Sequence, residues 1–358
     1  MVLRVATECS GLEPLPYALD RIGMGGRYSM VWACERDSKC RSLIRACHGK
    51  AAAKHIHCDI TERVAADVPD HDLYVAGFPC QPFSSMGLRQ GTADAQNRGT
   101  IFEYVLACLA AKLPRAFLLE NVRGLVTEHR RVFANMVSRL RGLKNRGYLV
   151  SWRVLNTEDH GIPQHRQRVY IVGIRRDAVV AAAPFTWPGP VKPKLLRAFL
   201  DQGTIRTTRS QCRRRLHNFV RESPPGLKRR LAAALRRAKR ARVDTEDPSQ
   251  PVLADVDASK PTLMRGRCPC ITRARGSTGF LLLPQGRRLS IAERLRLQGL
   301  PTSILRHRVA SGCNDRQLGA MVGNAMSLNI LERVLVRLLP ACGLAPGISL
   351  TDRWQSTS

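Results

Sequence analysis

The sequence is short of acidic residues relative to basic ones. Its 358 residues include 28 Asp and Glu against 58 Lys and Arg, which leaves a formal charge of +30 and an isoelectric point near 10.8. This imbalance indicates a polyanionic partner, of which nucleic acid is the commonest. A basic surface that is merely solvated is the alternative interpretation.

Long apolar runs are also absent. Charged residues interrupt every apolar stretch well before the roughly 20 residues that a membrane-spanning helix needs. Glu8 and Glu13 lie where a secretory signal would be continuously apolar. We therefore expect an intracellular protein with no membrane partner, nuclear in a eukaryote and otherwise in the nucleoid or cytoplasm.

The cysteines show no paired pattern. Twelve of them are scattered along the chain, at positions 9, 34, 40, 47, 58, 80, 108, 212, 268, 270, 313 and 342. Such scatter in a long chain is typical of reduced thiols rather than of a disulfide framework. Cys268 and Cys270 form the one close pair, and no second pair of ligands lies near them, so we expect no metal site.

The first half of the chain alternates short apolar runs with amphipathic stretches. We predict strands at residues 3–6, 29–34, 55–59, 73–77, 116–120, 148–155 and 169–174. Helices are expected between them, at 15–22, 38–48, 100–112 and 131–144, where apolar residues recur at helical spacing. Parallel strands joined by such crossovers predict the α/β class, with a doubly wound, mostly parallel sheet.

The length allows about two domains, and prolines at 184, 188, 190 and 193 mark a boundary. We expect a first domain at 1–184, a smaller, irregular and basic domain at 185–284, and a return to the first domain at 285–340. A loose polar tail is expected at 341–358. Within the returning segment, helices are predicted at 290–298 and 317–339.

Positive charge is concentrated between residues 206 and 242. This stretch holds fourteen Lys or Arg and a single acidic residue, Glu222, and residues 227–241 have the periodicity of a basic helix. We interpret it as a surface that contacts phosphates. A flexible basic linker or a localisation signal is the alternative.

Three motifs lie beside predicted strands. GFPCQPFS follows the strand at 73–77, where open α/β sheets bind ligands, and its prolines stiffen the backbone around Cys80. Cys80 is therefore a candidate nucleophile, with a buried structural thiol as the alternative. Glu120, in the triplet ENV, ends a strand at the same edge. Arg166 and Arg168 in GIPQHRQR precede the last strand and either face an anion or are solvated.

Together these motifs resemble those of the C5-cytosine DNA methyltransferases. GFPCQPFS, ENV, GIPQHRQR and GNAM occur here in that family's order, and the resemblance covers about residues 3–180 and 285–335. It implies a Rossmann-like class I methyltransferase fold and a target-recognition domain at 185–284. It also implies S-adenosylmethionine as the cofactor and DNA as the partner, with transfer of a methyl group to C5 of cytosine.

The resemblance further implies a role for individual residues. Cys80 would attack C6 of a flipped-out cytosine, Glu120 would donate a proton or hydrogen bond at N3, Arg166 would hold the base carbonyl and Arg168 would support the loop. The cofactor would be bound by Cys9, Ser10, Gly11, Leu12, Glu35, Asp59, Ile60, Pro79 and Asn324. The nucleic acid would be bound by Gln81, Ser84, Arg98, Arg213, Arg214, Arg215 and Arg273.

One turn departs from the family pattern. The family has a glycine-rich turn after the first strand, whereas Glu13 and Pro14 replace two glycines here. The departure keeps open a catalytically inactive nucleic-acid-binding homologue. An RNA (tRNA) cytosine-C5 methyltransferase is a further alternative, because the charge suits either polyanion. A nicotinamide-dependent dehydrogenase is disfavoured, since no GxGxxG follows the first strand.

Overall fold

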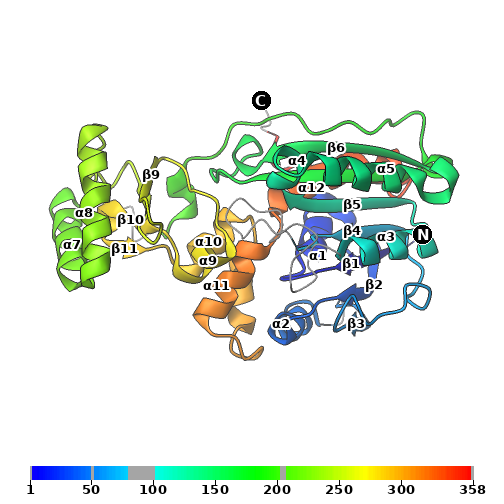
Figure 1. The fold of residues 1–358 in the computed structure, drawn as a ribbon, viewed down its shortest axis with the longest axis horizontal. Helices are drawn as coiled ribbons and strands as arrows, with labels where there is room; N and C mark the ends of the chain where they lie inside the picture. The colour runs from blue at the N-terminus through cyan, green and yellow to red at the C-terminus, as the bar shows by residue number, and fades with distance from the viewer. Residues whose placement is uncertain (1, 50–51, 80–100, 202–206, 356–358) are drawn as a thin grey trace.

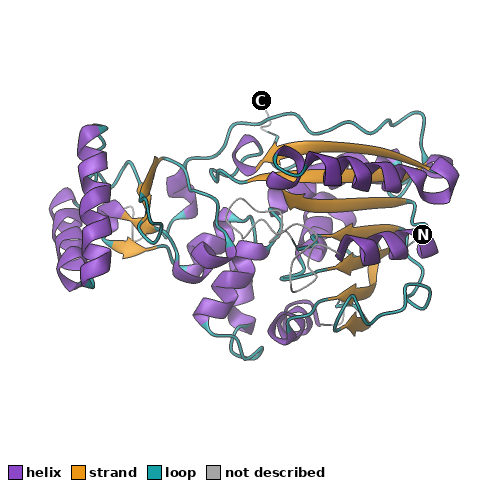
Figure 2. Ribbon diagram, in the orientation of Figure 1, coloured by secondary structure: helices purple, strands orange, loops and turns teal. Residues whose placement is uncertain are grey.

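The computed structural model describes residues 2–49, 52–79, 101–201 and 207–355. A large sheet with helices on both faces forms one part of the molecule, and a smaller part carrying α7 (Arg209–Glu222) and α8 (Pro225–Arg240) lies at the opposite end (Figure 1). Figure 2 shows that strands are concentrated in the first part and that helices dominate the second.

The large sheet has seven strands in the order β3-β2-β1-β4-β5-β7-β6. They are β1 (Leu3–Glu8), β2 (Tyr28–Cys34), β3 (His55–His57), β4 (Leu73–Ala76), β5 (Ala116–Val122), β6 (Tyr148–Asn156) and β7 (Gln167–Arg175). The first five pair in parallel, and β7 runs antiparallel to both β5 and β6. The predicted α/β class with a mostly parallel sheet is confirmed. The last two strands are antiparallel because a short connection joins them directly, without a crossover helix.

Two apolar clusters cover the faces of this sheet. Alternate residues of β1 point to opposite sides, so Val5 joins one cluster and Ala6 the other. The first cluster receives α1 (Pro14–Leu19), α2 (Ser38–His48) and α12 (Leu328–Ala341), and the second receives α3 (Ile101–Lys112) and α5 (Arg130–Arg146). The predicted helix at 15–22 is instead α1 followed by a π-helical segment, Asp20–Met24.

The predicted helix at 317–339 is wrong as a single element. It consists of α11 (Asp315–Asn324) and α12, separated by Ala325, Met326 and Ser327. Ala325 and Ser327 are extended, and the Ala325 carbonyl accepts hydrogen bonds from Arg166 and Gln298. The apolar spacing continues through the break, so the pattern alone does not reveal it.

The smaller part has a four-stranded sheet in the order β11-β10-β8-β9. These strands are β8 (Val252–Asp255), β9 (Thr262–Arg265), β10 (Leu281–Leu282) and β11 (Arg287–Arg288). Leu216 of α7 and Leu231 of α8 are buried with residues of β8 and β10. The basic helix predicted at 227–241 is present as α8, whereas α7 was not predicted.

The remaining helices are short. They are α4 (Gly124–Thr127), α9 (Arg273–Thr278), α10 (Ile291–Leu297) and the 3-10 segments Thr157–Asp159, Arg176–Ala178, Leu196–Phe199, Leu283–Gln285 and Thr302–His307. No helix in the described ranges is long and apolar enough to cross a membrane.

The described end of the tail is anchored, which differs from the loose segment expected at 341–358. Trp354 is 9% exposed and its indole nitrogen donates to Glu332 at 2.5 Å. Asp352 accepts from Arg333 at 2.9 Å, and Arg353 pairs with Glu332 at 2.8 Å. An aromatic side chain and two ion pairs therefore hold a segment whose polar composition suggested solvent exposure.

Glycines bring α9 and α11 into backbone contact. A Cβ atom at Gly276 would overlap the Gly319 carbonyl, and one at Gly323 would overlap the Thr272 carbonyl. This contact therefore fixes α9 against α11.

Gly276→Ala is expected to lower the free energy of unfolding by about 1–3 kcal/mol, because the added methyl group forces α9 away from α11. Urea unfolding followed by circular dichroism measures the effect. Gly142→Ala is the matched control, because a Cβ there meets no atom within 4 Å, and alanine in a helix should stabilise by about 0.5–1 kcal/mol. Equal stability of the Gly276→Ala variant and the wild type would contradict the close contact.

Candidate active site

Several strands that carry predicted site residues end at one edge of the large sheet. Pairing places Glu8 of β1 beside Cys34 of β2 and Ala76 of β4, and Ala76 beside Leu119 of β5. The segments after these strands therefore emerge side by side, at the carboxyl edge where open α/β sheets bind ligands.

The turn after β1 is tied to the neighbouring strand. The amide of Gly11 donates to Glu35 Oε2 at 2.7 Å, and the amide of Ser10 donates to the Cys34 carbonyl at 3.3 Å. Cys9, Gly11 and Glu13 all have left-handed backbone angles, with φ of 52°, 56° and 50°. The predicted cofactor residues Cys9, Ser10, Gly11 and Glu35 are thus brought together.

The other predicted cofactor residues differ in their surroundings. Leu12 and Ile60 are buried in the two apolar clusters, so their side chains are committed to packing. Asp59 is half-buried and accepts from the Thr61 amide at 2.9 Å, beside Arg36 at 3.3 Å. Asn324 is exposed at the end of α11, two residues before Met326, which packs close to Gly77.

Glu120 is buried at the end of β5. It is 8% exposed, and burial raises the pKa of its carboxyl, while the positive charges of Arg168 and Arg166 lower it. Arg168 Nε lies 3.2 Å from Glu120 Oε1, an ion pair without hydrogen-bond alignment, and that oxygen has no hydrogen-bond partner in the described chain. A buried carboxyl with an open oxygen suits proton or hydrogen-bond donation.

The start of GFPCQPFS lies against this carboxyl. A Cβ atom at Gly77 would be 3.7 Å from Glu120 Oε2. The side-chain amide of Asn121 donates to the Phe78 carbonyl at 3.4 Å. Pro79 follows and is half-buried. The predicted residues Cys80, Gln81, Ser84 and Arg98 lie outside the described residues.

The two arginines of GIPQHRQR have distinct environments. Arg166 is 2% exposed, and its guanidinium donates to the carbonyls of Ile271 at 2.8 Å, Gly323 at 3.2 Å and Ala325 at 2.9 Å. Arg168 is the one that pairs with Glu120. The geometry therefore gives Arg166 the supporting position and Arg168 the position beside the carboxyl, the reverse of the expected arrangement.

Cys270 also lies beside these two arginines, a contact that the sequence did not predict. Its sulfur lies 3.8 Å from Arg166 and 3.7 Å from Arg168. Burial opposes ionisation, but the two guanidinium groups outweigh it and hold the pKa of the Cys270 thiol below its usual value. In the sequence Cys270 stands out only as one of a close pair, and no group of His, Cys, Asp and Glu in the described residues could hold a metal ion.

The predicted nucleic-acid residues that are described fall in two places. Arg273 is exposed at the first position of α9, next to the α11 contact. Arg213, Arg214 and Arg215 lie on α7, at the far end of the smaller part (Figure 1). Arg213 pairs with Glu246 and Arg215 donates to Gln285, whereas Arg214 is exposed without a partner in the described ranges.

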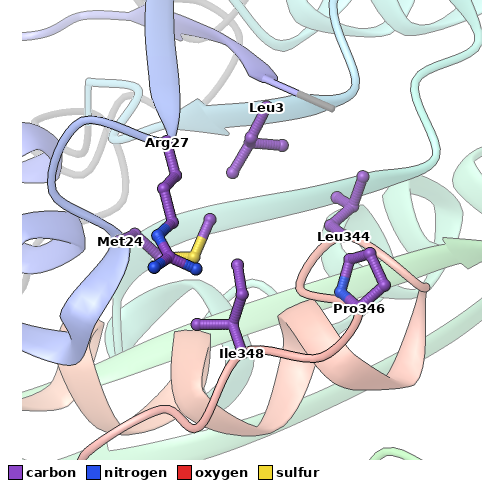
Figure 3. A pocket seen from close by; sticks show the side chains of 6 residues that line it. All are labelled: Leu3, Met24, Arg27, Leu344, Pro346 and Ile348. Atoms are coloured by element: carbon purple, nitrogen blue, oxygen red, sulfur yellow. The ribbon is translucent and has the colours of Figure 1, made fainter.

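A pocket lies away from this edge of the sheet. Figure 3 shows the side chains that line it, Leu3, Met24, Arg27, Leu344, Pro346 and Ile348. Its volume is about 280 Å³. Leu3 begins β1, so this pocket lies at the opposite end of the strand from the turn that holds Ser10 and Gly11. It takes no part in the site assembled at the carboxyl edge.

The mostly parallel, seven-stranded sheet with helices on both faces is a Rossmann-like methyltransferase fold. The family of C-5 cytosine-specific DNA methylases matches residues 4–339. The chain belongs to this family and is a DNA cytosine-C5 methyltransferase.

Relatives extend over most of the chain. It is 32% identical over 337 residues to the type II methyltransferase M.NgoBI of Neisseria gonorrhoeae, covering 93% of this chain and 92% of that one. It is also 32% identical over 289 residues to M.HaeII of Haemophilus aegyptius, covering 80% of each. Among solved structures, the Dnmt2 methyltransferase of S. pombe superposes with a TM-score of 0.60 at 20% identity, covering 95% of this chain and 99% of that one. That likeness concerns the fold.

Arg166→Lys is expected to lower the free energy of unfolding by about 2 kcal/mol or more, because one ammonium group cannot reach three separated carbonyls and leaves buried acceptors unpaired. Arg168→Lys is the matched comparison and should cost less, since lysine keeps the positive charge that pairs with Glu120. Guanidinium chloride unfolding measures both. Equal losses for the two variants would contradict the supporting position of Arg166.

Proposed function

We propose that the chain methylates C5 of a cytosine extruded from DNA, through a covalent bond between the Cys80 sulfur and C6 of the base. The observation that carries this proposal is the position of Glu120. Its buried carboxyl lies beside Arg168, against the first residues of the GFPCQPFS loop, and on the same sheet edge as the turn after β1.

The chemistry requires a nucleophile that can add and leave. Cytosine is unreactive at C5, and a thiolate that adds to C6 makes C5 nucleophilic. Glu120 would stabilise the electron density displaced onto the ring by donating at N3, and burial raises the pKa of its carboxyl, which favours the protonated form that can donate. The nucleophilic C5 then takes a methyl group from the donor, and loss of the C5 proton to a base expels the Cys80 thiolate and leaves 5-methylcytosine.

Arg168 would hold the carbonyl of the base. Its guanidinium is the one next to Glu120, so it can reach the same base edge while keeping the carboxyl oriented. Arg166 would act through its three carbonyl contacts, which fix the loop that presents Arg168. The base is reached only after extrusion from the duplex, at a cost of a few kcal/mol.

S-adenosylmethionine would supply the methyl group as an electrophile. The residues at the carboxyl edge suit it, because Gly11 allows close backbone approach and the Glu35 carboxylate stands beside the turn, where it can also accept from ribose hydroxyls. Asp59 and Ile60 would frame the adenine. Pro79 and Asn324 would border the binding site of the methyl donor.

Exposed arginines that have no partner in the described part of the chain would bind phosphates. Arg229, Arg236 and Arg240 lie on one face of α8 and are exposed, as is Arg214 on α7. Arg273 would contact the DNA closer to the target base, since α9 packs beside the site. Phosphate contacts of this kind orient a protein on DNA without reading its sequence.

Cys80→Ser is expected to lower turnover at least about a thousandfold, because a hydroxyl is a far weaker nucleophile at neutral pH. DNA affinity should stay within about threefold, since phosphate contacts supply most of it. Methylation is measured by bisulfite sequencing of duplex DNA treated with the purified chain, which also reports the sequence context.

Trapping on substrates that contain 5-fluorocytosine separates the possible substrates. The wild type should form a covalent complex with duplex DNA and none with transfer RNA, and Cys80→Ser should form neither. A complex with transfer RNA alone would replace DNA by RNA as the substrate. Equal loss of activity and of DNA affinity in Cys80→Ser would make Cys80 a structural residue.

Replacing Arg214, Arg229, Arg236 and Arg240 with alanine should weaken DNA binding and flatten its salt dependence. Each phosphate contact that is lost lowers the slope of log affinity against log salt by about 0.9. Fluorescence anisotropy with duplex DNA at several salt concentrations gives the slope. Lys144→Ala is the control, because Lys144 pairs with Asp177 in the larger part; an unchanged slope in the fourfold variant would rule out this surface.

A further inference from the structure

Three acidic side chains surround the turn after β1, and they are satisfied in different ways. Glu8 is paired with Arg63 and accepts from Tyr74. Glu35 accepts from the amides of Gly11 and Asp37, at 2.7 and 2.9 Å. Glu13 accepts from the Thr7 hydroxyl at 2.6 Å and has no cationic partner in the described residues.

The conformation of Glu13 is unusual for a residue with a side chain. Its φ and ψ of 50° and 67° are left-handed, a region that favours glycine. Its amide donates to the Ser10 carbonyl at 2.7 Å, and the hydroxyls of Thr7 and Ser10 lie 2.8 Å apart. The backbone of Glu13 is therefore strained, and this conformation directs the Glu13 carboxyl to the inner side of the turn.

The carboxyl of Glu13 faces the protein interior. Glu13 is 2% exposed and lines a small pocket with Thr7, Ser10, Val75, Met326 and Leu331. The pocket measures about 10 Å³, which is space for about one water molecule. A ligand cannot enter it, so any effect of Glu13 on a ligand bound over the turn acts through the turn and its electric field.

A buried carboxyl without a cation is costly unless it is neutral or gains a positive charge nearby. We propose that Glu13 is a positioning residue that shapes the turn through Thr7 and Ser10 and supplies the counter-charge for the sulfonium group of the methyl donor. This inference rests on the proposed use of S-adenosylmethionine. It explains how the turn functions without two of the family's glycines, and it predicts preference for the cationic donor over its neutral thioether product.

The ionisation of Glu13 makes this preference dependent on pH. Burial raises the pKa of Glu13 to about 7, the hydroxyls of Thr7 and Ser10 lower it, and the charge of Glu35 raises it. The other titratable groups around it are Glu8 in the same pocket, Tyr28, and His48, which bonds to the Glu13 backbone. Below its pKa Glu13 is neutral and provides no counter-charge. Above it the carboxylate is present, so binding of a cation releases a proton near neutral pH.

Isothermal titration calorimetry of the full chain with S-adenosylmethionine and with S-adenosylhomocysteine, from pH 6 to pH 8, tests the proposal. The affinity for the donor should rise about tenfold with pH, a coupling of about one pKa unit, and the affinity for the product should change far less. Titrations in two buffers of different ionisation enthalpy should show more protons released by the donor than by the product.

Two variants identify the group that titrates. Glu13→Gln should show a pH-independent donor affinity close to that of the wild type at pH 6. Thr7→Val removes a hydrogen bond to the carboxylate and should move the midpoint to higher pH. Glu222→Gln is the matched control, because it makes the same change on the exposed surface of α7, and it should behave as wild type.

The outcomes are distinguishable. A wild-type pH dependence that persists in Glu13→Gln would overturn the proposal and assign the proton to another group, such as Glu8. Equal pH dependence for donor and product would also overturn it, while leaving the methyltransferase assignment intact. A wild-type chain that binds neither compound would overturn the use of S-adenosylmethionine, and the role of Glu13 with it. If Glu13→Gln does not fold, the donor and product titrations of the wild type still decide.

Discussion

The arrangement of the site depends on one buried guanidinium. Arg166 donates to the carbonyls of Ile271, Gly323 and Ala325, which belong to segments far apart in the chain. These bonds link the segment at Ile271 to the sheet. They also satisfy the carbonyl of Ala325, one of the extended residues that separate α11 from α12. Buried carbonyls need donors, and a planar guanidinium with five N–H groups can serve several at once. Because Arg168 lies two residues after Arg166, these three hydrogen bonds also fix the position of Arg168 beside Glu120.

Charge inside the site is balanced unevenly. Glu120 and Cys270 flank the two arginines, so two cations and two ionisable acids share a space shielded from water. Around the turn after β1 the balance is acidic, with Arg63 beside Glu8 and no cation beside Glu13 in the described chain. One end of the site is therefore suited to an electron-rich base and the other to a positively charged donor. This division matches a reaction that moves a methyl cation equivalent onto a pyrimidine.

The spacing of apolar residues in the sequence predicted the strands of the large sheet well and the tertiary contacts poorly. Seven short runs were sufficient to place β1 to β7, and the clearest were those of β4 and β5, which are buried on both faces. Helix α7 was missed because few of its residues are buried. The break between α11 and α12 was missed because an apolar face continues through it. Trp354 was expected in a loose tail because its hydrogen-bond partner, Glu332, lies in another segment of the chain, which a local sequence pattern cannot reveal.

The sequence by itself determined the fold class, the ordered motifs and the excess positive charge, because these depend on residue type and local spacing. Only the tertiary structure decided which arginine lies beside Glu120, that Cys270 lies between the two guanidinium groups, and that Glu13 has no cation beside it among the described residues. These properties depend on distances between segments remote in sequence and on their removal from water. Electrostatic energy changes steeply with both, so residue identity alone cannot assign the partners.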